Sequence, residues 1–215
     1  DDKIYLRGAD KTYGGVLGGD GDDYIDASEA SDAGILDGQY GDDKIYGNEG
    51  INTLKGGYGK DNLWAYGGND TLDGGDGDDF LSGGDGDDTL IGGFNSDRFE
   101  GGAGSDVFYG TSIDKLFEND TKPADEPLDK DVVVYTGSAD DYKILKLDDA
   151  YYISDSRGID GLDTLFGITD LEFAGENTYT PDEFVAYSSS NDPGTDDNLQ
   201  GTENSDLLSG LGGND

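Results

Sequence analysis

The feature that most constrains the fold of this chain is a nine-residue phrase that repeats without interruption. Between Gly38 and Tyr109 it occurs eight times, with glycine favoured at positions one, two and four, aspartate at six and an apolar residue at eight. The units read GQYGDDKIY, GNEGINTLK, GGYGKDNLW, AYGGNDTLD, GGDGDDFLS, GGDGDDTLI, GGFNSDRFE and GGAGSDVFY. An earlier copy, GGDGDDYID, ends at Asp26, and weaker copies begin after residue 191. A short period sustained over this length predicts a solenoid in which each repeat contacts its neighbours.

Each unit predicts a glycine-rich turn of six residues followed by a strand of three. Glycine adopts the positive φ that tight turns need, and the residues around position eight alternate with a period of two. Because the chain reverses at each turn, two units make one coil of 18 residues. We therefore expect an all-β fold, a flattened parallel β-solenoid with turns along both edges. The position-eight residues of the clear copies are Ile25, Ile45, Leu54, Leu63, Leu72, Leu81, Leu90, Phe99 and Phe108.

The aspartates at position six predict cation sites. Residues 18 apart fall on the same edge about 4.8 Å from each other, and bare carboxylates at that spacing repel by about 1 kcal/mol per pair even in water. A divalent ion between each pair reverses this sign. Carboxylate and carbonyl oxygens, without nitrogen or sulfur ligands, favour Ca²⁺ over Mg²⁺. One column contains Asp43, Asp61, Asp79 and Asp97, and the other contains Asn52, Asp70, Asp88 and Asp106.

Composition excludes several classes of function. The chain has 50 Asp and Glu against 13 Lys and Arg, a formal charge of −37, which disfavours nucleic acids and anionic membranes as partners. It contains no His and no Cys, which removes Ser-His and Cys-His catalysis, HExxH zinc sites and thiolate metal sites. No apolar run is long enough to span a membrane. We expect no catalytic residues, and we expect folding to need cations, because each unit buries only about one large apolar side chain.

The phrase Gly-Gly-x-Gly-x-Asp-x-apolar-x resembles the repeats-in-toxin (RTX) nonapeptide of haemolysin-type calcium-binding proteins and serralysin-like proteases. The resemblance covers about half of the chain. It implies a right-handed parallel β-roll in which calcium lies between turns one coil apart, with about six to eight ions in all. Each ion would take the carbonyls of positions two and four and the aspartate of one turn, and the carbonyls of positions one and three and the aspartate of the next.

The residues that this resemblance implies as calcium ligands are, in chain order, Asp23, Gln39, Gly41, Asp43, Asn48, Gly50, Asn52, Gly56, Gly57, Tyr58, Gly59, Asp61, Ala65, Tyr66, Gly67, Gly68, Asp70, Gly74, Gly75, Asp76, Gly77, Asp79, Gly83, Gly84, Asp85, Gly86, Asp88, Gly92, Phe94, Asp97, Gly101, Ala103 and Asp106. Some of them depart from the family pattern or lie outside the regular repeats. Asn52 replaces an aspartate and predicts a weaker site, and Ala65 and Tyr66 replace glycines but keep their carbonyls. Asp23 would pair with Asp43 in a seventh site. Asn95 also replaces a glycine but tolerates left-handed φ.

The remaining segments predict the division of the chain. Residues 1–36 read as irregular first coils, with a short insertion in ASEASDAGILD, and residues 37–109 as the regular roll. Residues 110–190 carry four alternating apolar stretches, DVVVYTG, DYKILKL, AYYISD and DLEFAG, which predict a small antiparallel β element that caps the exposed sheet edges. This run also resembles a segment that follows the repeats in secreted RTX proteins. Residues 191–215 read as the start of a second repeat block, and DSRGIDGLD is either a further calcium loop or a plain hairpin loop.

Exposed side chains leave other interpretations open. Tyr46 and Trp64 lie 18 apart, with Tyr40 and Tyr58 in nearby turns, and such a strip either stacks on a sugar or braces a thin roll. A column of Thr53, Thr71 and Thr89 suggests an ice-binding face, but its flanking column is irregular. Two carboxylates could also form the acid and base of a glycosidase, but with 50 Asp and Glu residues in the chain a pair of acids is no evidence for catalysis.

Two hypotheses for the parent protein follow. The first is a calcium-folded module of a secreted or surface bacterial protein, exported by a type I system as the resemblance implies, which acts as folding switch, spacer or stabiliser in a long adhesin. The second is the C-terminal repeat region of a secreted enzyme or toxin whose active domain lies outside this chain, where an HExxH or GxSxG motif upstream of Asp1 would identify it. Glycan binding by an adhesin module is a third alternative.

Overall fold

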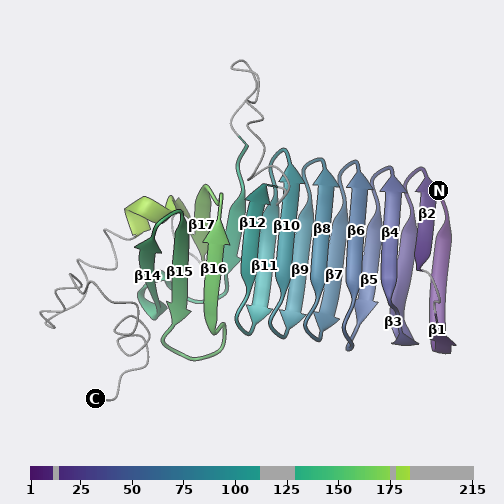
Figure 1. The fold of residues 1–215 in the computed structure, drawn as a ribbon, viewed down its shortest axis with the longest axis horizontal. Helices are drawn as coiled ribbons and strands as arrows, with labels where there is room; N and C mark the ends of the chain where they lie inside the picture. Colours follow the sequence, from purple (N-terminus) through teal and green to yellow (C-terminus); the bar gives the residue numbers. More distant parts are fainter. Residues whose placement is uncertain (12–14, 112–128, 175–177, 185–215) are drawn as a thin grey trace, which may run out of the picture.

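The computed structural model of the chain describes residues 1–11, 15–111, 129–174 and 178–184. Within these residues the fold is all-β, and its strands form two stacked nine-stranded sheets. Figure 1 shows a long roll whose strands run across its axis, with a smaller β element at the end opposite the N-terminus. No helix of the described residues is long and apolar enough to cross a membrane.

The first sheet contains one strand from each coil and continues into the cap. Its spatial order is β1 (Lys3–Lys11), β3 (Tyr24–Asp32), β5 (Lys44–Asn48), β7 (Asn62–Gly67), β9 (Phe80–Asp85), β11 (Arg98–Ala103), β13 (Val132–Tyr135), β17 (Asp170–Phe173) and β18 (Thr178–Tyr179). Neighbouring strands pair in parallel from β1 to β17, whereas β17 and β18 are antiparallel.

The second sheet contains the alternate strands. Its order is β14 (Tyr142–Leu147), β15 (Ala150–Asp155), β16 (Leu162–Phe166), β12 (Val107–Thr111), β10 (Thr89–Phe94), β8 (Thr71–Asp76), β6 (Thr53–Tyr58), β4 (Ile35–Tyr40) and β2 (Val16–Asp20). Pairing is parallel from β2 to β16 and antiparallel through the β14–β15 hairpin. A short 3-10 helix, Ala139–Asp141, precedes β14. The predicted parallel solenoid with 18 residues per coil and a small antiparallel element is confirmed.

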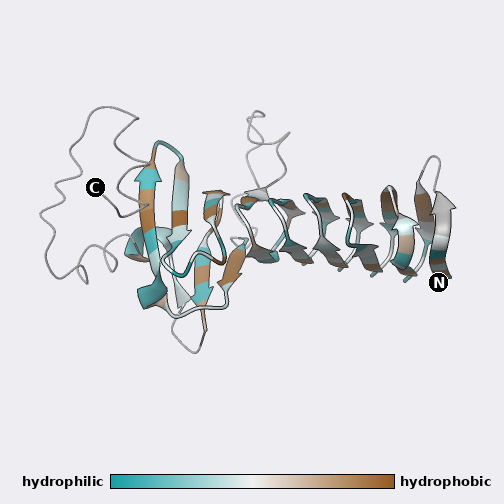
Figure 2. Ribbon diagram, turned by 90° about the horizontal axis from the view of Figure 1, so that it is seen from below, coloured by the Kyte–Doolittle hydropathy of each residue, from teal (hydrophilic) through white to brown (hydrophobic). Residues whose placement is uncertain are grey.

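The core of the regular roll consists of the position-eight side chains of the two sheets, and it continues into the cap through residues such as Tyr135 and Phe173. Leu54, Leu72 and Leu90 lie in register on one sheet, and Leu63, Leu81 and Phe99 on the other, all with no exposed surface. Figure 2, which looks along the strands, shows how little space separates the two sheets. Leu36 takes the buried position of the degenerate unit, so the insertion before it leaves the core row unbroken.

Two local expectations were wrong. Most regular strands have six residues rather than three. Strand pairing continues through the glycines of positions one and two, as in the pair Gly57 and Gly75. Only three residues are therefore left for each turn. The stretches DVVVYTG and DLEFAG were expected in the antiparallel element. Instead β13 pairs only in parallel and continues the roll, while β17 pairs in parallel with β13 and antiparallel with β18. Val133 and Leu171 are further core residues.

Candidate metal centre

The predicted position-six columns exist as hydrogen-bonded ladders along the two turn edges. The Asp43 amide donates to Asp61 Oδ1 at 2.7 Å, and the Asp61 amide donates to Asp79 Oδ1 at 2.8 Å. On the other edge the Asp70 amide donates to Asp88 Oδ1 at 2.8 Å. One oxygen of each carboxylate thus accepts a hydrogen bond from the preceding coil. From the sequence, only repulsion between the carboxylates was expected, and this stabilising interaction was not predicted.

The second oxygen of each of these carboxylates has no hydrogen-bond partner. These Oδ2 atoms are inaccessible to solvent, although burying an unpaired carboxylate oxygen is costly. The residues concerned are Asp23, Asp43, Asp61, Asp70, Asp79, Asp88, Asp97 and Asp106. Eight orphaned acceptors in two regular rows indicate that a ligand of positive charge completes them.

The glycines at position one leave the space that such a ligand needs. A Cβ placed on Gly74 would lie 2.4 Å from Asp79 Oδ2 and 2.7 Å from the carbonyl oxygen of Gly92 in the next coil. A Cβ on Gly38 would meet Asp43 Oδ2 and the Gly56 carbonyl oxygen in the same way. The free carboxylate oxygen and a carbonyl oxygen of the next coil therefore face one cradle, as the ligand pattern requires.

The pKa values of these carboxyls also show that burying their negative charge is unfavourable without a partner. Burial, and to a lesser extent neighbouring carboxylates, raises the pKa of Asp61 and Asp79 to about 7 and that of Asp97 to about 9. The same desolvation raises the pKa of Asp43 and Asp88 to about 6. Without a cation, burial therefore favours the protonated form of Asp97 at neutral pH and brings Asp61 and Asp79 close to half-protonation there.

The carbonyls of position three are only partly available to an ion. The carbonyl of Asp76 accepts the amide of Gly59 at 2.8 Å, and that of Ala103 accepts the amide of Gly86 at 2.7 Å. The carbonyls of Tyr58, Asp85 and Phe94 are engaged in the same way. A carbonyl oxygen has a second lone pair, so these hydrogen bonds leave one acceptor site on each.

The donor set suits a hard cation. In the residues that the structure describes, no three His, Cys, Asp or Glu side chains form a cluster that could hold a metal. Apart from the Asn52 junction, the junctions between coils instead combine two carboxylates with backbone carbonyls. Such an all-oxygen set is the kind that Ca²⁺ accepts, and the residues present fit that ion.

The Asn52 junction departs from this arrangement, as its sequence predicted. Asn52 Oδ1 accepts the amide of Asn48 at 2.7 Å, and its Nδ2 donates to Asn48 Oδ1 at 3.0 Å. The amide side chain is thus satisfied within its own turn, and only Asp70 offers a carboxylate to this junction. The substituted turn positions keep the glycine backbone: Gln39, Tyr66 and Asn95 all have φ near +80°.

Sequence reasoning missed two members of the columns. The Asp97 amide donates to Asp131 Oδ1 at 3.0 Å, and the Asp106 amide donates to Asp163 Oδ1 at 2.9 Å. Both partners are buried in the cap. For Asp163 a signal existed, because residues 158–166 read GIDGLDTLF, a further copy of the phrase.

The junction beside Asp163 opens into a cavity of about 250 Å³. Gly102, Asp160, Asp163 and Tyr135 are among its lining residues. Tyr135 Oη is buried without a hydrogen-bond partner, and burial, then the Asp163 carboxylate, raises the pKa of this hydroxyl well above its usual value. A buried polar atom without a hydrogen-bond partner therefore also lies at the boundary between the roll and the cap.

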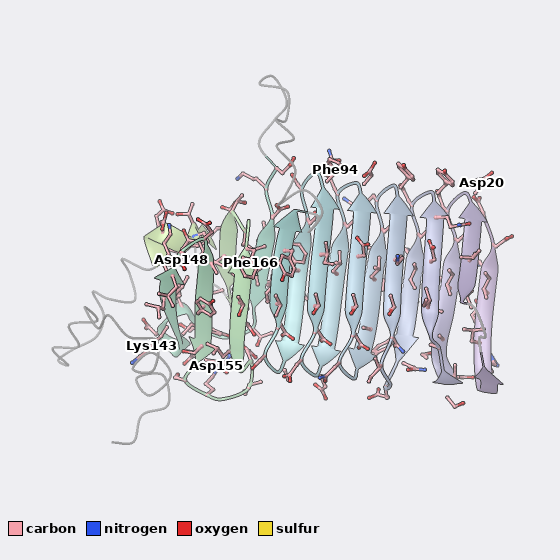
Figure 3. The ribbon with its side chains drawn as sticks, viewed as in Figure 1. Asp20, Phe94, Lys143, Asp148, Asp155 and Phe166 are labelled. Atoms are coloured by element: carbon pink, nitrogen blue, oxygen red, sulfur yellow. The ribbon has the colours of Figure 1, made fainter. Side chains whose placement is uncertain are left out.

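The loop DSRGIDGLD is organised by an arginine at its start. Arg157 Nε donates to Asp155 Oδ1 at 3.0 Å, and the amides of Ile159 and Asp160 donate to Asp155 Oδ2 at 2.9 and 3.2 Å. The guanidinium also donates to Asp160 and to the Tyr142 hydroxyl. Asp155, at the lower turn edge of the cap in Figure 3, is thus neutralised from within the chain. These contacts favour the plain-loop interpretation at Asp155 and Asp160.

Replacing Arg157 with methionine is expected to destabilise the cap by about 1–3 kcal/mol, because the buried Asp155 carboxylate loses its cation. Arg7→Met provides a matched control, since the Arg7–Glu29 pair is largely exposed and should cost little. Urea unfolding in saturating calcium, followed by amide exchange of β14 to β16, measures both variants. Equal stability of the two variants would contradict this role of Arg157.

The aromatic rings of this strip stack in pairs, with Tyr40 and Tyr58 exposed and Tyr46 and Trp64 half-buried. Tyr46 and Trp64 lie with ring centroids 4.7 Å apart and planes at 5°, and Tyr40 and Tyr58 are 5.1 Å apart at 5°. Stacking covers one face of each ring and so reduces the ring surface that a sugar could contact. The arrangement supports the bracing interpretation of the aromatic strip.

A stacked parallel solenoid with glycine-lined turns and rows of buried, half-satisfied carboxylates defines a cation-binding repeat protein of the β-roll class. Residues 31–50, 37–72, 46–81, 82–112 and 194–215 match the family model of the RTX calcium-binding nonapeptide repeat. The chain belongs to this calcium-binding repeat family through these segments. No curated protein matches the chain.

Proposed function

We propose that this chain is a calcium-dependent folding module of an extracellular bacterial protein. The observation that carries the proposal is the set of eight buried Oδ2 atoms without partners. Seven of them face a glycine at position one, whereas the unit of Asp70 has Ala65 there. Nine pairs of column residues are joined between coils, five on one edge and four on the other, and in each pair a backbone amide donates to an aspartate Oδ1. Each of these junctions is a candidate calcium site, and the Asn52 junction is the weakest.

The charge of the chain supports a switch between two compartments. With a formal charge of −37, the calcium-free chain repels itself and resists compaction. An ion that binds only the folded state stabilises it by mass action, by about 1.8 kcal/mol per site at 20 times its dissociation constant. Millimolar calcium outside a cell thus favours the roll, and the low free calcium of the cytosol favours the unfolded chain.

The parent protein in this proposal is a long adhesin exported by type I secretion, in which the roll acts as folding switch, spacer or stabiliser. The family match at residues 194–215 supports a second repeat block, as a multi-block protein would have. The alternative is the repeat region of a secreted enzyme or toxin. The sequence of the parent on the N-terminal side of Asp1 separates the two, since a protease or lipase motif there favours the enzyme.

The ligand role of the columns is tested by Asp88→Asn. Asparagine keeps the Oδ1 acceptor for the Asp70 amide but removes the charged Oδ2 from two adjacent junctions. We expect this variant to bind about two fewer calcium ions and to need several-fold more calcium to fold. Isothermal titration gives the stoichiometry, with Asp37→Asn on β4 as the control for charge lost away from the turns. An unchanged stoichiometry in Asp88→Asn would contradict the proposal.

A further inference from the structure

The residues at position five form a second set of hydrogen bonds between coils, which we call the outer ladder. On one edge Asp22 Oδ1 accepts the Asp42 amide at 3.0 Å, and Asp42 Oδ1 accepts the Lys60 amide at 2.8 Å. On the other edge Asp87 Oδ1 accepts the Ser105 amide at 2.9 Å. The remaining acceptors of the outer ladder are Asp1, Asn69, Asp78, Ser96 and Ser105.

The outer ladder runs opposite to the position-six columns. At position six, the carboxylate of the later coil accepts the amide of the earlier coil, as Asp61 does from Asp43. At position five, the side chain of the earlier coil accepts the amide of the later coil, as Asp42 does from Lys60. Where both are present, each turn is fixed to its neighbour in both directions. The position-five side chain therefore helps to set the spacing of the two turns that enclose a cation.

Two residues interrupt the outer ladder, and both interruptions fall at one step between coils. Ile51 precedes Asn69 on one edge, and Lys60 precedes Asp78 on the other. An aliphatic side chain and an ammonium group have no lone pair to offer an amide. The coil of residues 47–64 and the next coil, residues 65–82, are therefore not joined by hydrogen bonds of the outer ladder on either edge. We call the boundary between these two coils the step.

Other contacts are also weaker at this step. The Asn52 junction, with its single carboxylate, spans it. The parallel ring stacks end there: Tyr58 lies opposite Asp76 in the next coil, and Trp64 meets Phe80 only in a tilted contact at 5.7 Å. The strand pairing of β6 with β8 and of β7 with β9 continues across the step.

We propose that position-five side chains position the calcium-binding turns, and that Ile51 and Lys60 divide the roll into two blocks that respond to calcium separately. The N-terminal block is residues 16–64, and the C-terminal block is residues 65–111 with the cap. The inference rests on the proposed calcium-dependent folding. We expect the N-terminal block to open first as the calcium concentration falls. The C-terminal block is additionally held by hydrogen bonds to the cap, which involve Ser96, Ser105, Asp131 and Asp163.

The test is amide hydrogen exchange of the whole chain at a series of free calcium concentrations. Protection of β4 and β5 reports on the N-terminal block, and protection of β10 and β11 reports on the C-terminal block. We expect the wild-type blocks to lose protection at calcium concentrations that differ by about twofold or more. Loss of protection at one shared concentration overturns the division into blocks, whereas protection that is independent of calcium overturns the proposed function itself.

Variants that restore an acceptor at position five test whether the missing hydrogen bonds cause the division into two blocks. Ile51→Asn with Lys60→Asn supplies acceptors at both interruptions, and Ile51→Ala with Lys60→Leu makes the same loss of charge without acceptors. The asparagine pair is expected to merge the two transitions and to lower the calcium midpoint of the N-terminal block by roughly fivefold. If the two double variants behave alike, position five does not act through its hydrogen bond.

A neutral pair of variants tests position five at an intact junction. Ser105 Oγ accepts the Leu162 amide at 3.0 Å, so Ser105→Ala removes the acceptor and Ser105→Thr keeps it. We expect the alanine variant to raise the calcium midpoint of β10 and β11 by about twofold to fivefold, and the threonine variant to match wild type. Equal midpoints for alanine and threonine would count against the positioning role.

Discussion

Replacing Gly86 with alanine is expected to prevent the central coils from folding at calcium concentrations that fold the wild-type chain. Gly86 has φ +138°, and a Cβ there would lie 1.7 Å from the carbonyl oxygen of Gly68 in the preceding coil. The atom that it meets belongs to a backbone that is tied to the coil of Gly86, because the Gly68 amide donates to the Asp85 carbonyl at 2.8 Å, so moving it away breaks this contact. We expect a loss of more than about 3 kcal/mol, which combines steric overlap with a disallowed φ.

Gly19→Ala separates these two causes. Gly19 has a similar φ of +112° but nothing within 4 Å of its Cβ position. This control should cost only the backbone strain, about 1–2 kcal/mol. Calcium titrations of both variants, followed by far-UV circular dichroism, compare them directly. If Gly86→Ala folds at the same calcium concentration as Gly19→Ala, the close stacking of turns is not what constrains this position.

Acid is expected to replace part of the effect of calcium. In the chelated protein, burial raises the folded-state pKa of several column carboxyls, to about 6 for Asp43, about 7 for Asp70 and about 9 for Asp97. A pKa raised on folding means that the folded state binds protons more tightly than the unfolded chain. The resulting stability is fully present below the ordinary aspartate pKa and is lost as pH rises through about 6 to 9.

We therefore expect chelated protein to gain strand signal as pH falls from 9 to 5, and calcium to bind more weakly over the same range because protons compete for Oδ2. Far-UV circular dichroism in chelator measures the first effect, with sedimentation to exclude aggregation. Asp70→Asn with Asp88→Asn, which removes two of the titrating groups, should flatten the pH response. A strand signal that stays constant or falls on acidification would contradict this assignment of the buried carboxyls.

The regular part of the fold could be predicted because one local pattern is repeated in one register. Asp61 and Leu63 recur in equivalent form every nine residues, so the turn, the core row and the 18-residue coil follow from spacing alone. The predicted columns were found with their members in hydrogen-bond contact. Their role as calcium ligands stays a prediction.

The remaining features depend on contacts that no short period reveals. Asp131 and Asp163 lie 34 and 57 residues from the aspartates that they continue, because intervening chain separates the strands of the last coils. The Arg157 side chain satisfies Asp155 through a turn whose geometry is not encoded in the repeat. Position five varies between Asp, Asn, Ser, Lys and Ile, so its shared role as an acceptor emerges only from the stacking of coils.

The most direct test of the account is a calcium titration of chelated protein at pH 7.5 or above, followed by far-UV circular dichroism, with magnesium in parallel. The orphaned carboxylate oxygens predict a cooperative gain of strand signal near about 0.1–1 mM Ca²⁺, the range of extracellular calcium modules, and no such gain with Mg²⁺. Equal strand signal in chelator and in calcium would contradict the account. The position-six columns would then hold the roll through their Oδ1 hydrogen bonds alone.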